Sequence, residues 1–177
     1  IFAAFISYLN MSQQIFQNLY SKKESFALYF GLIALVIGLA SFLNGRFVKT
    51  WGALNIVKWA TVSLFLSAVG FLFVVWFFQQ PPFFLFLFML LPMMFAIGFL
   101  FGNLNAIAME PLGHIAGVGA SFIGAVSTII SVPIATYIGL TYNKTLWPLA
   151  LSFLVMSILA LGLIYIAHYS RPKIIEK

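Results

Sequence analysis

Uncharged amides are the residues of this chain best suited to bind a solute. Near the N-terminus they recur three and four residues apart, so that they share one face of a helix. Amides in hydrocarbon are costly unless they meet water or polar partners. We therefore expect either a wet cavity for neutral or amphipathic solutes, or hydrogen bonds that hold neighbouring helices together. The candidate cavity residues are Tyr8, Asn10, Gln13, Gln14 and Gln17.

A second set of candidate cavity residues follows Pro92, which removes a backbone hydrogen bond and can kink a helix. Met93, Met94 and Phe95 offer the soft, adaptable surface that promiscuous binding sites often use. The alternative for each of these residues is simple packing against lipid. All three residues are candidates for the cavity.

The third feature is a pair of titratable residues, Glu110 and His114, separated by four positions around Pro111. Histidine can change its charge near neutral pH, so this pair is a candidate gate or proton-linked site. The alternative is that Glu110 only complements the dipole of the helix that begins after it. One Glu and one His do not make a metal site, so we expect no metal.

Enzymatic chemistry finds little support. Ser121 and His114 are seven residues apart, about 10 Å along a helix, too far for a nucleophile and its base. The chain has no cysteine, which excludes thiolate catalysis, disulfides and Cys-ligated metals. We expect no enzyme and no cofactor.

Composition shows which elements must position these residues. The 177-residue chain is 63% hydrophobic and 7% charged, whereas soluble domains carry about 25% charged residues. The bilayer is therefore its expected partner. The 9 basic residues fall in short gaps between apolar runs, so we interpret them as orientation signals rather than a nucleic-acid-binding face.

The apolar runs do not alternate as barrel strands do, and they predict an all-α integral membrane protein with six transmembrane helices. A tail, 169–177, follows the last of them. The chain opens at Ile1 without an initiator Met, and we expect it to be a fragment with more sequence upstream. The predicted spans are roughly 1–20, 26–45, 54–78, 83–105, 115–140 and 147–168.

Six spans place both ends of the chain on one side of the membrane. Six basic residues fall on that side and three on the other, so the positive-inside rule predicts that both ends are cytoplasmic. We expect a multi-pass protein of a bacterial-type inner (plasma) membrane. The first group is Arg46, Lys49, Lys58, Arg171, Lys173 and Lys177, and the second is Lys22, Lys23 and Lys144.

Small residues at four-residue spacing predict places where helices pack closely. Gly98 and Gly102 form one such pair. A longer run begins the fifth span and should let a neighbouring backbone approach. It consists of Gly113, Gly117, Ala120, Ser121, Gly124 and Ala125.

Three stretches of the chain resemble the C-terminal half of a major facilitator superfamily transporter, most closely the Bcr/CflA-type drug:proton antiporter group. SYLNMSQQIFQNLY with FALYFGLIALVIGLASFLNGRFVKTWG resembles the seventh and eighth helices. FGNLNAIAMEPLGHIAGVGASFIGAVSTII, the most specific, resembles the tenth and eleventh helices, and YNKTLWPLA the entry to the twelfth. The resemblance implies twelve helices in the whole protein, with an N-terminal half that this chain lacks.

In that superfamily the seventh and tenth helices help to line the central cavity, which favours the amides and Met93, Met94 and Phe95 as cavity residues. LNGRFVKTWG is similar to the superfamily's cytoplasmic loop motif at Gly45, Arg46 and Gly52. The motif's acid is missing here, which weakens the expectation of a charge-locked gate at Arg46.

The mechanism that the resemblance implies is alternating access, with export of drugs or other amphipathic molecules driven by inward proton movement. The usual proton-carrying acid lies in the absent half, so we expect no transport by this chain alone. One alternative keeps the fold and moves a metabolite such as an amino acid or sugar derivative. Another is a non-transporting subunit of a membrane complex, in which contacts between helices satisfy the hydrogen bonds of the N-terminal amides.

Overall fold

The structure is a computed structural model that describes residues 1–169, and every regular element in that range is helical. The predicted tail lies outside the described residues except for Tyr169. Two short helices of other types, η1 and η2, interrupt the series of α-helices. The elements are α1 (Phe2–Gln14), η1 (Ile15–Leu19), α2 (Phe26–Trp51), α3 (Ala53–Phe78), α4 (Phe83–Met109), η2 (Glu110–Ile115), α5 (Ala116–Leu140) and α6 (Trp147–Tyr169).

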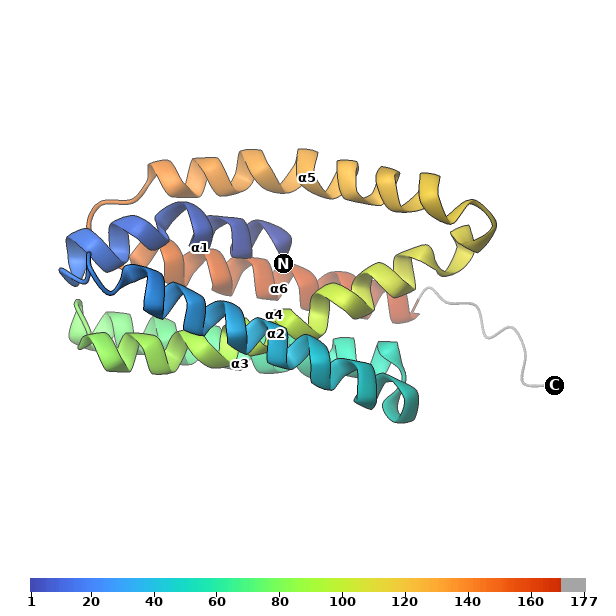
Figure 1. Cartoon of the computed structure of the whole chain (residues 1–177), viewed down its shortest axis with the longest axis horizontal. Helices are drawn as coiled ribbons and strands as arrows, with labels where there is room; N and C mark the ends of the chain where they lie inside the picture. Colours follow the sequence, from blue (N-terminus) through green and yellow to red (C-terminus); the bar gives the residue numbers. More distant parts are fainter. Residues whose placement is uncertain (170–177) are drawn as a thin grey trace.

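Length and composition allow several of these helices to cross a bilayer, namely α2, α3, α6 and the continuous run Phe83–Leu140. The chain reverses direction at η2, which divides that run into α4 and α5, and both helices lie alongside the rest of the bundle (Figure 1). The prediction of an all-helical chain is thereby confirmed for residues 1–169, and its long apolar helices suit a multi-pass membrane protein. The exception is α1, whose 13 residues fall short of the about 20 that a crossing needs; it begins near the middle of the bundle's length (Figure 1).

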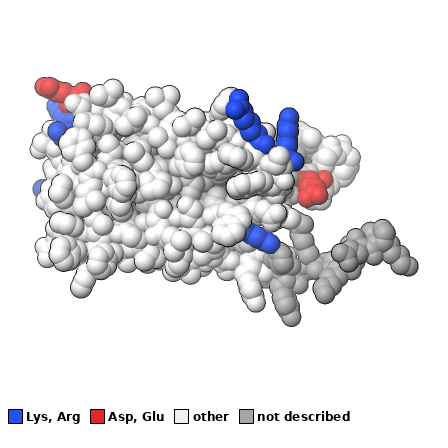
Figure 2. All heavy atoms as spheres, turned by 90° about the horizontal axis from the view of Figure 1, so that it is seen from below, with Lys and Arg blue, Asp and Glu red and all other residues white. Residues whose placement is uncertain are grey.

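The charged residues of the described chain lie at the two ends of the bundle. Figure 2, which looks onto the side of α2 and α3, shows basic and acidic side chains at both ends and none over the middle. An uncharged band between two charged ends is the surface that a bilayer requires. Three of the six basic residues on which the predicted orientation depends, Arg171, Lys173 and Lys177, lie outside the described residues.

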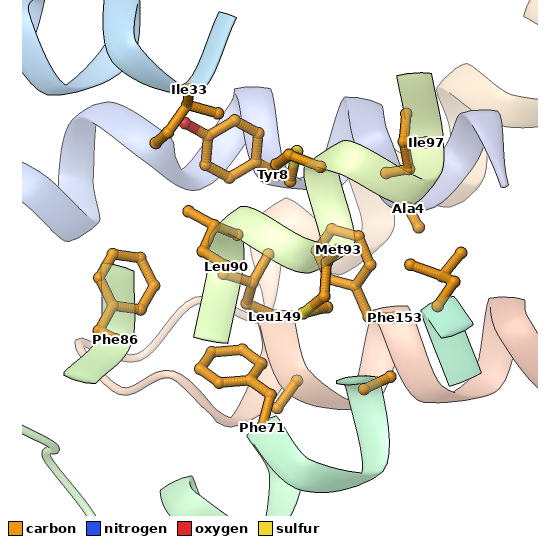
Figure 3. Packing of buried hydrophobic residues seen from close by; sticks show 14 of the residues in the cluster. Ala4, Tyr8, Ile33, Phe71, Phe86, Leu90, Met93, Ile97, Leu149 and Phe153 are labelled. Carbon is orange, nitrogen blue, oxygen red and sulfur yellow. The ribbon is translucent and has the colours of Figure 1, made fainter. Parts of the chain in front are cut away.

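The bundle is organised around α4, which packs against α2 and α3, while α3 packs on α6 and α1 packs on α5 and α6. Pro92 lies inside α4, and Figure 1 shows that this helix is bent. Figure 3 shows the resulting core, where Leu90 and Met93 of α4 meet Phe71 of α3 and Phe153 of α6. Because lipid tails are as apolar as these side chains, close packing rather than water exclusion must hold this core together.

Among the glycines of the chain, Gly98 is the one most tightly packed against another helix. A Cβ atom there would lie 2.6 Å from both the Cβ of Ala40 and the carbonyl oxygen of Ile37 on α2. One turn later the buried Asn103 donates its amide hydrogens to Asn44 Oδ1 and to the Phe99 carbonyl. The prediction of close packing is confirmed at Gly98. At Gly102 the nearest atom would be 3.5 Å away, which is ordinary contact.

The small residues at the start of α5 behave differently. A Cβ added at Gly113, Gly117 or Gly124 would meet no described atom within 4 Å. The prediction that a neighbouring backbone packs on this face is therefore wrong for the described chain. The physical reason is that α1 lies beside only the C-terminal half of α5 (Figure 1), where Ser131 and Ala135 are buried.

Candidate solute-binding face on α1

Helix α1 has two faces of opposite character. Its buried face packs into the bundle, and its other face exposes three of the four predicted amides, Asn10, Gln13 and Gln14, with Gln17 half-buried. Asn18 is also exposed and continues the stripe. Its spacing of four residues from Gln14 was the signal in the sequence that could have identified it. The buried face consists of Ala3, Ala4, Ser7, Tyr8, Met11 and Ser12.

The side chains of this amide stripe (Asn10, Gln13, Gln14, Gln17 and Asn18) make no hydrogen bond to any other group within residues 1–169. Each amide offers two N–H donors and an acceptor oxygen. Left in hydrocarbon, each unpaired group would cost several kcal/mol, by the order of magnitude for buried polar groups. The stripe must therefore face water or a polar surface that the described chain does not provide.

The stripe itself contacts α5, and the buried side of η1 contacts α2. Asn10 lies against Gly139 of α5, where an added Cβ would be 3.5 Å from the Asn10 Cβ. On the other side, the ring of Phe16 packs edge-on against Phe26 of α2 at 5.7 Å between centroids. These contacts fix α1 and η1 in the bundle, while the amides on their other face stay exposed or half-buried.

The helix changes type within the stripe. Residues Ile15–Leu19 form a π-helical turn, in which Tyr20 N–H donates to the Ile15 carbonyl at 3.1 Å. Such turns are rare and occur frequently at functional sites. No spacing in the sequence indicated this turn, and it places Gln17 and Asn18 on a helix that is locally wider than α1.

Tyr8 is buried on the opposite face of α1 from the amides. Its ring stacks on Phe30 of α2 with 6.4 Å between centroids, and Figure 3 shows it beside Ile33. Its hydroxyl is buried without a hydrogen-bond partner among the described residues. The structure therefore places Tyr8 in the apolar core and apart from the stripe.

The three candidates on α4 also lie apart from the amides. Met93 and Met94 are fully buried in the bundle core. Phe95 is half-buried and lines a groove between α2 and α3. The structure therefore brings together the amides of α1 but does not join them to Met93, Met94 or Phe95.

A hollow of about 410 Å³ lies between the first turn of α1, the C-terminal half of α4 and α5. Sequence reasoning did not identify it, because its lining comes from three separate segments. Asn105, Ser127 and Thr128 are its polar residues, and Thr128 donates its hydroxyl hydrogen to the Gly124 carbonyl at 2.8 Å. The remaining lining is Ile1, Phe2, Phe101, Leu104 and Gly124.

The proposed gate residues lie at one end of the bundle and remain separate there. Glu110 and His114 both belong to η2 and are exposed, and no ion pair joins them within the described part of the chain. The guanidinium carbon of Arg46 lies 5.2 Å from the ring centroid of Phe42, its neighbour on α2. This is a cation–π contact within one helix rather than a lock between two helices.

The opposite end of the bundle is tied by loop contacts. Tyr20 donates its hydroxyl hydrogen to the Pro81 carbonyl at 2.9 Å, and Gln80 donates its amide hydrogen to the Leu19 carbonyl at 3.2 Å. Burial, with a contribution from nearby Tyr142, raises the pKa of Tyr20 well above its ordinary value, and burial also raises the pKa of Tyr142. Both phenols stay uncharged at neutral pH.

The chemistry available at the amide stripe is hydrogen bonding without proton transfer, since it contains no titratable side chain. The described acids, Glu24 and Glu110, are exposed at the ends of the bundle, and residues 1–169 hold no cluster of three or more potential metal ligands.

Comparison with protein-family models, curated proteins and solved structures found no match for this chain.

Proposed function

We propose that this chain is the C-terminal half of a major facilitator superfamily transporter of the Bcr/CflA-type antiporter group, and that the amide stripe of α1 lines its solute cavity. The observation that carries the proposal is a row of unpaired amides on the outside of a bundle otherwise fitted to lipid. The resemblance of the sequence to the seventh and tenth helices of that group supports the assignment of α1 and α4.

In this proposal the two halves rock around a midplane site and open it to each side in turn. The amides hold the polar groups of a small amphipathic solute by hydrogen bonds that water can replace in either open state. The stripe holds no acid, so the proton-binding group belongs to the N-terminal half. Inward proton movement then drives export across an inner membrane, with both ends of this chain in the cytoplasm.

One observation favours a second substrate class on the same fold. The stripe consists entirely of amides, which match the hydroxyl and amide groups of a sugar or amino acid derivative as well as they match a drug. The third candidate, a non-transporting subunit, would cover the stripe with a polar helix of a partner. These three functions differ in what reaches the stripe: an amphipathic compound, a hydrophilic metabolite or neither.

Cysteine labelling tests the proposal directly because the chain has no cysteine of its own. In membranes of the producing cell we expect a polar thiol reagent to label a Gln14→Cys variant rapidly. The matched control is Leu35→Cys on α2, where the side chain is 71% exposed and faces lipid, and we expect little labelling there. Protection of both cysteines would mean that the amide stripe is dry, and the transport proposal would fail.

The same variant separates the substrate classes. Slower labelling of Gln14→Cys in the presence of a lipophilic organic cation, but not of a neutral sugar, supports drug export. The reverse pattern supports a metabolite transporter. Labelling that neither compound slows, in a protein shown to be folded, argues against a solute site at this face.

A further inference from the structure

A groove separate from the amide stripe opens on the side of the bundle formed by α2 and α3. It has a volume of about 210 Å³, and α4 forms its floor. It exists because α2 and α3 each pack on α4 rather than closely on each other. The lining residues are Phe47, Trp51, Ile56, Trp59, Ala60, Ser63, Phe95, Ala96 and Phe99.

The turn between the two helices brings the groove close to the end of the bundle. Only Gly52 separates α2 from α3, and its φ of 73° lies in the left-handed region that favours glycine. Trp51, which is 57% exposed, lies directly before this turn, and Trp59, which is 70% exposed, lies on the second turn of α3. Tryptophan is enriched at the level where hydrocarbon meets the headgroups, so the mouth of the groove lies at that level.

The groove then runs inward from its mouth. Ile56 and Ser63 are seven residues apart on α3, about 10 Å along its axis. The hydrocarbon core of a bilayer is about 30 Å thick, so each leaflet contributes about 15 Å. The groove therefore covers most of the depth of one leaflet, beginning at the headgroups.

Three basic residues lie at the end of the bundle where the groove has its mouth. Arg46 and Lys49 lie on the last turns of α2, and Lys58 lies on the second turn of α3. Figure 2 looks onto this side and shows basic side chains at this end and no charge over the apolar middle. Glu110 is the acid of the described chain at this end, so the basic residues outnumber it. The lining of the groove holds no charged residue, but Lys and Arg clustered beside membrane helices attract anionic headgroups to the membrane surface.

We propose that this groove binds a single anionic phospholipid. One acyl chain lies between the aromatic walls, and the phosphate lies at the mouth near Arg46, Lys49 and Lys58. The long basic side chains reach the phosphate by extending along the bilayer surface. The occupant is a lipid because the groove opens on the apolar outside of the bundle, where lipid is the surrounding medium.

Tryptophan quenching by brominated lipids tests the proposal, with Trp59 kept as the sole tryptophan through Trp51→Phe, Trp76→Phe and Trp147→Phe. A minor fraction of the vesicle lipid is brominated, either as phosphatidylglycerol or as phosphatidylcholine, and the quenching of Trp59 fluorescence gives the relative affinity of each lipid for the groove. We expect the affinity for phosphatidylglycerol to be about fivefold higher, which is the effect of one well-placed basic residue. The control protein has its only tryptophan at position 54, from Leu54→Trp. Leu54 lies one turn before Lys58 and does not line the groove. A tryptophan at this position is therefore close to the same basic residues but outside the cavity.

Two further variants complete the test. Ser63→Phe fills the groove from an exposed position and should abolish the preference for anionic lipid at Trp59. Replacing Arg46, Lys49 and Lys58 by Gln should do the same without altering the cavity. An equal preference at positions 54 and 59 would mean that the end of the bundle merely attracts anionic lipid. That result would overturn the proposal. So would the absence of a preference for anionic lipid at Trp59, or a preference that remains after either set of substitutions.

Discussion

Replacing Gly98 by alanine should separate α2 from α4. The added methyl would approach Ala40 Cβ and the Ile37 carbonyl oxygen to 2.6 Å, about 0.8 Å short of ordinary contact. Neither atom can move without its helix, because one is a backbone oxygen and the other is attached directly to the backbone. The methyl therefore has to displace α2, and the hydrogen bond from Ser41 to the Gly98 carbonyl at 3.2 Å is displaced with it.

The expected size of this effect follows from three contributions. Overpacking in a tight interface costs about 1–3 kcal/mol. The bonds of Ser41 and Asn103 cross the same interface, and membrane hydrogen bonds are worth about 0.6 kcal/mol each. Exchange of glycine for alanine inside a helix stabilises the helix by about 1 kcal/mol. A control at Gly38, which has no neighbour within 4 Å, receives only the last contribution. Gly98→Ala should thus be about 2–4 kcal/mol less stable than Gly38→Ala.

The assay is reversible unfolding in mixed micelles of rising sodium dodecyl sulfate content, followed by tryptophan fluorescence. Gly102→Ala is a second control, since its Cβ would have an ordinary contact of 3.5 Å. Adding Ala40→Gly to Gly98→Ala should restore part of the stability but not all of it, because the Ile37 oxygen remains. If the Gly98 and Gly38 variants were equally stable, α2 and α4 would not meet as described.

Three further predictions concern polar groups at the ends and in the core. Asn103→Leu leaves Asn44 unpaired and should lower the free energy of unfolding by about 1 kcal/mol in the same assay. Because the folded state raises the pKa of Tyr20 above the ordinary value of about 10, its stabilising contribution is complete below about pH 10 and is lost as the pH rises further. The melting temperature should accordingly fall above pH 10, and less steeply in Tyr20→Phe. Tyr142→Phe removes a buried hydroxyl that has no partner among the described residues, so the melting temperature at pH 7 should stay equal or rise.

The helices could be predicted from the sequence because apolar runs of bilayer length are separated by proline and polar residues. The close contact at Gly98 could also be predicted, but its restriction to Gly98 could not. Gly102 belongs to the same pair and has the same chemistry, yet a Cβ atom added there would make only ordinary contact with Asn44. Which glycine marks the crossing point depends on the angle between α2 and α4, and small-residue spacing does not encode that angle.

The candidate site shows the same division. Helical periodicity was enough to place Asn10, Gln13 and Gln14 on one face, because each is polar against an apolar background. Met93 and Met94 had no such contrast: α4 is apolar on nearly every side, so no pattern indicated that these two residues face the core. The π-helical turn at Ile15–Leu19 is decided by hydrogen bonding between backbone groups, which leaves no signature in residue type.

The outside of this bundle presents two surfaces that one solvent cannot satisfy. Leu35, Leu66 and Phe73 of α2 and α3 are more than half exposed and suit hydrocarbon. Gln13 and Gln14 of α1 are also exposed, and they suit water or a polar partner. Lipid around the whole bundle would leave the amides unpaired, and water around it would expose the leucines and phenylalanines. The bundle should therefore meet lipid on the side of α2 and α3 and something polar on the side of α1, which is the asymmetry that the proposed solute pathway requires.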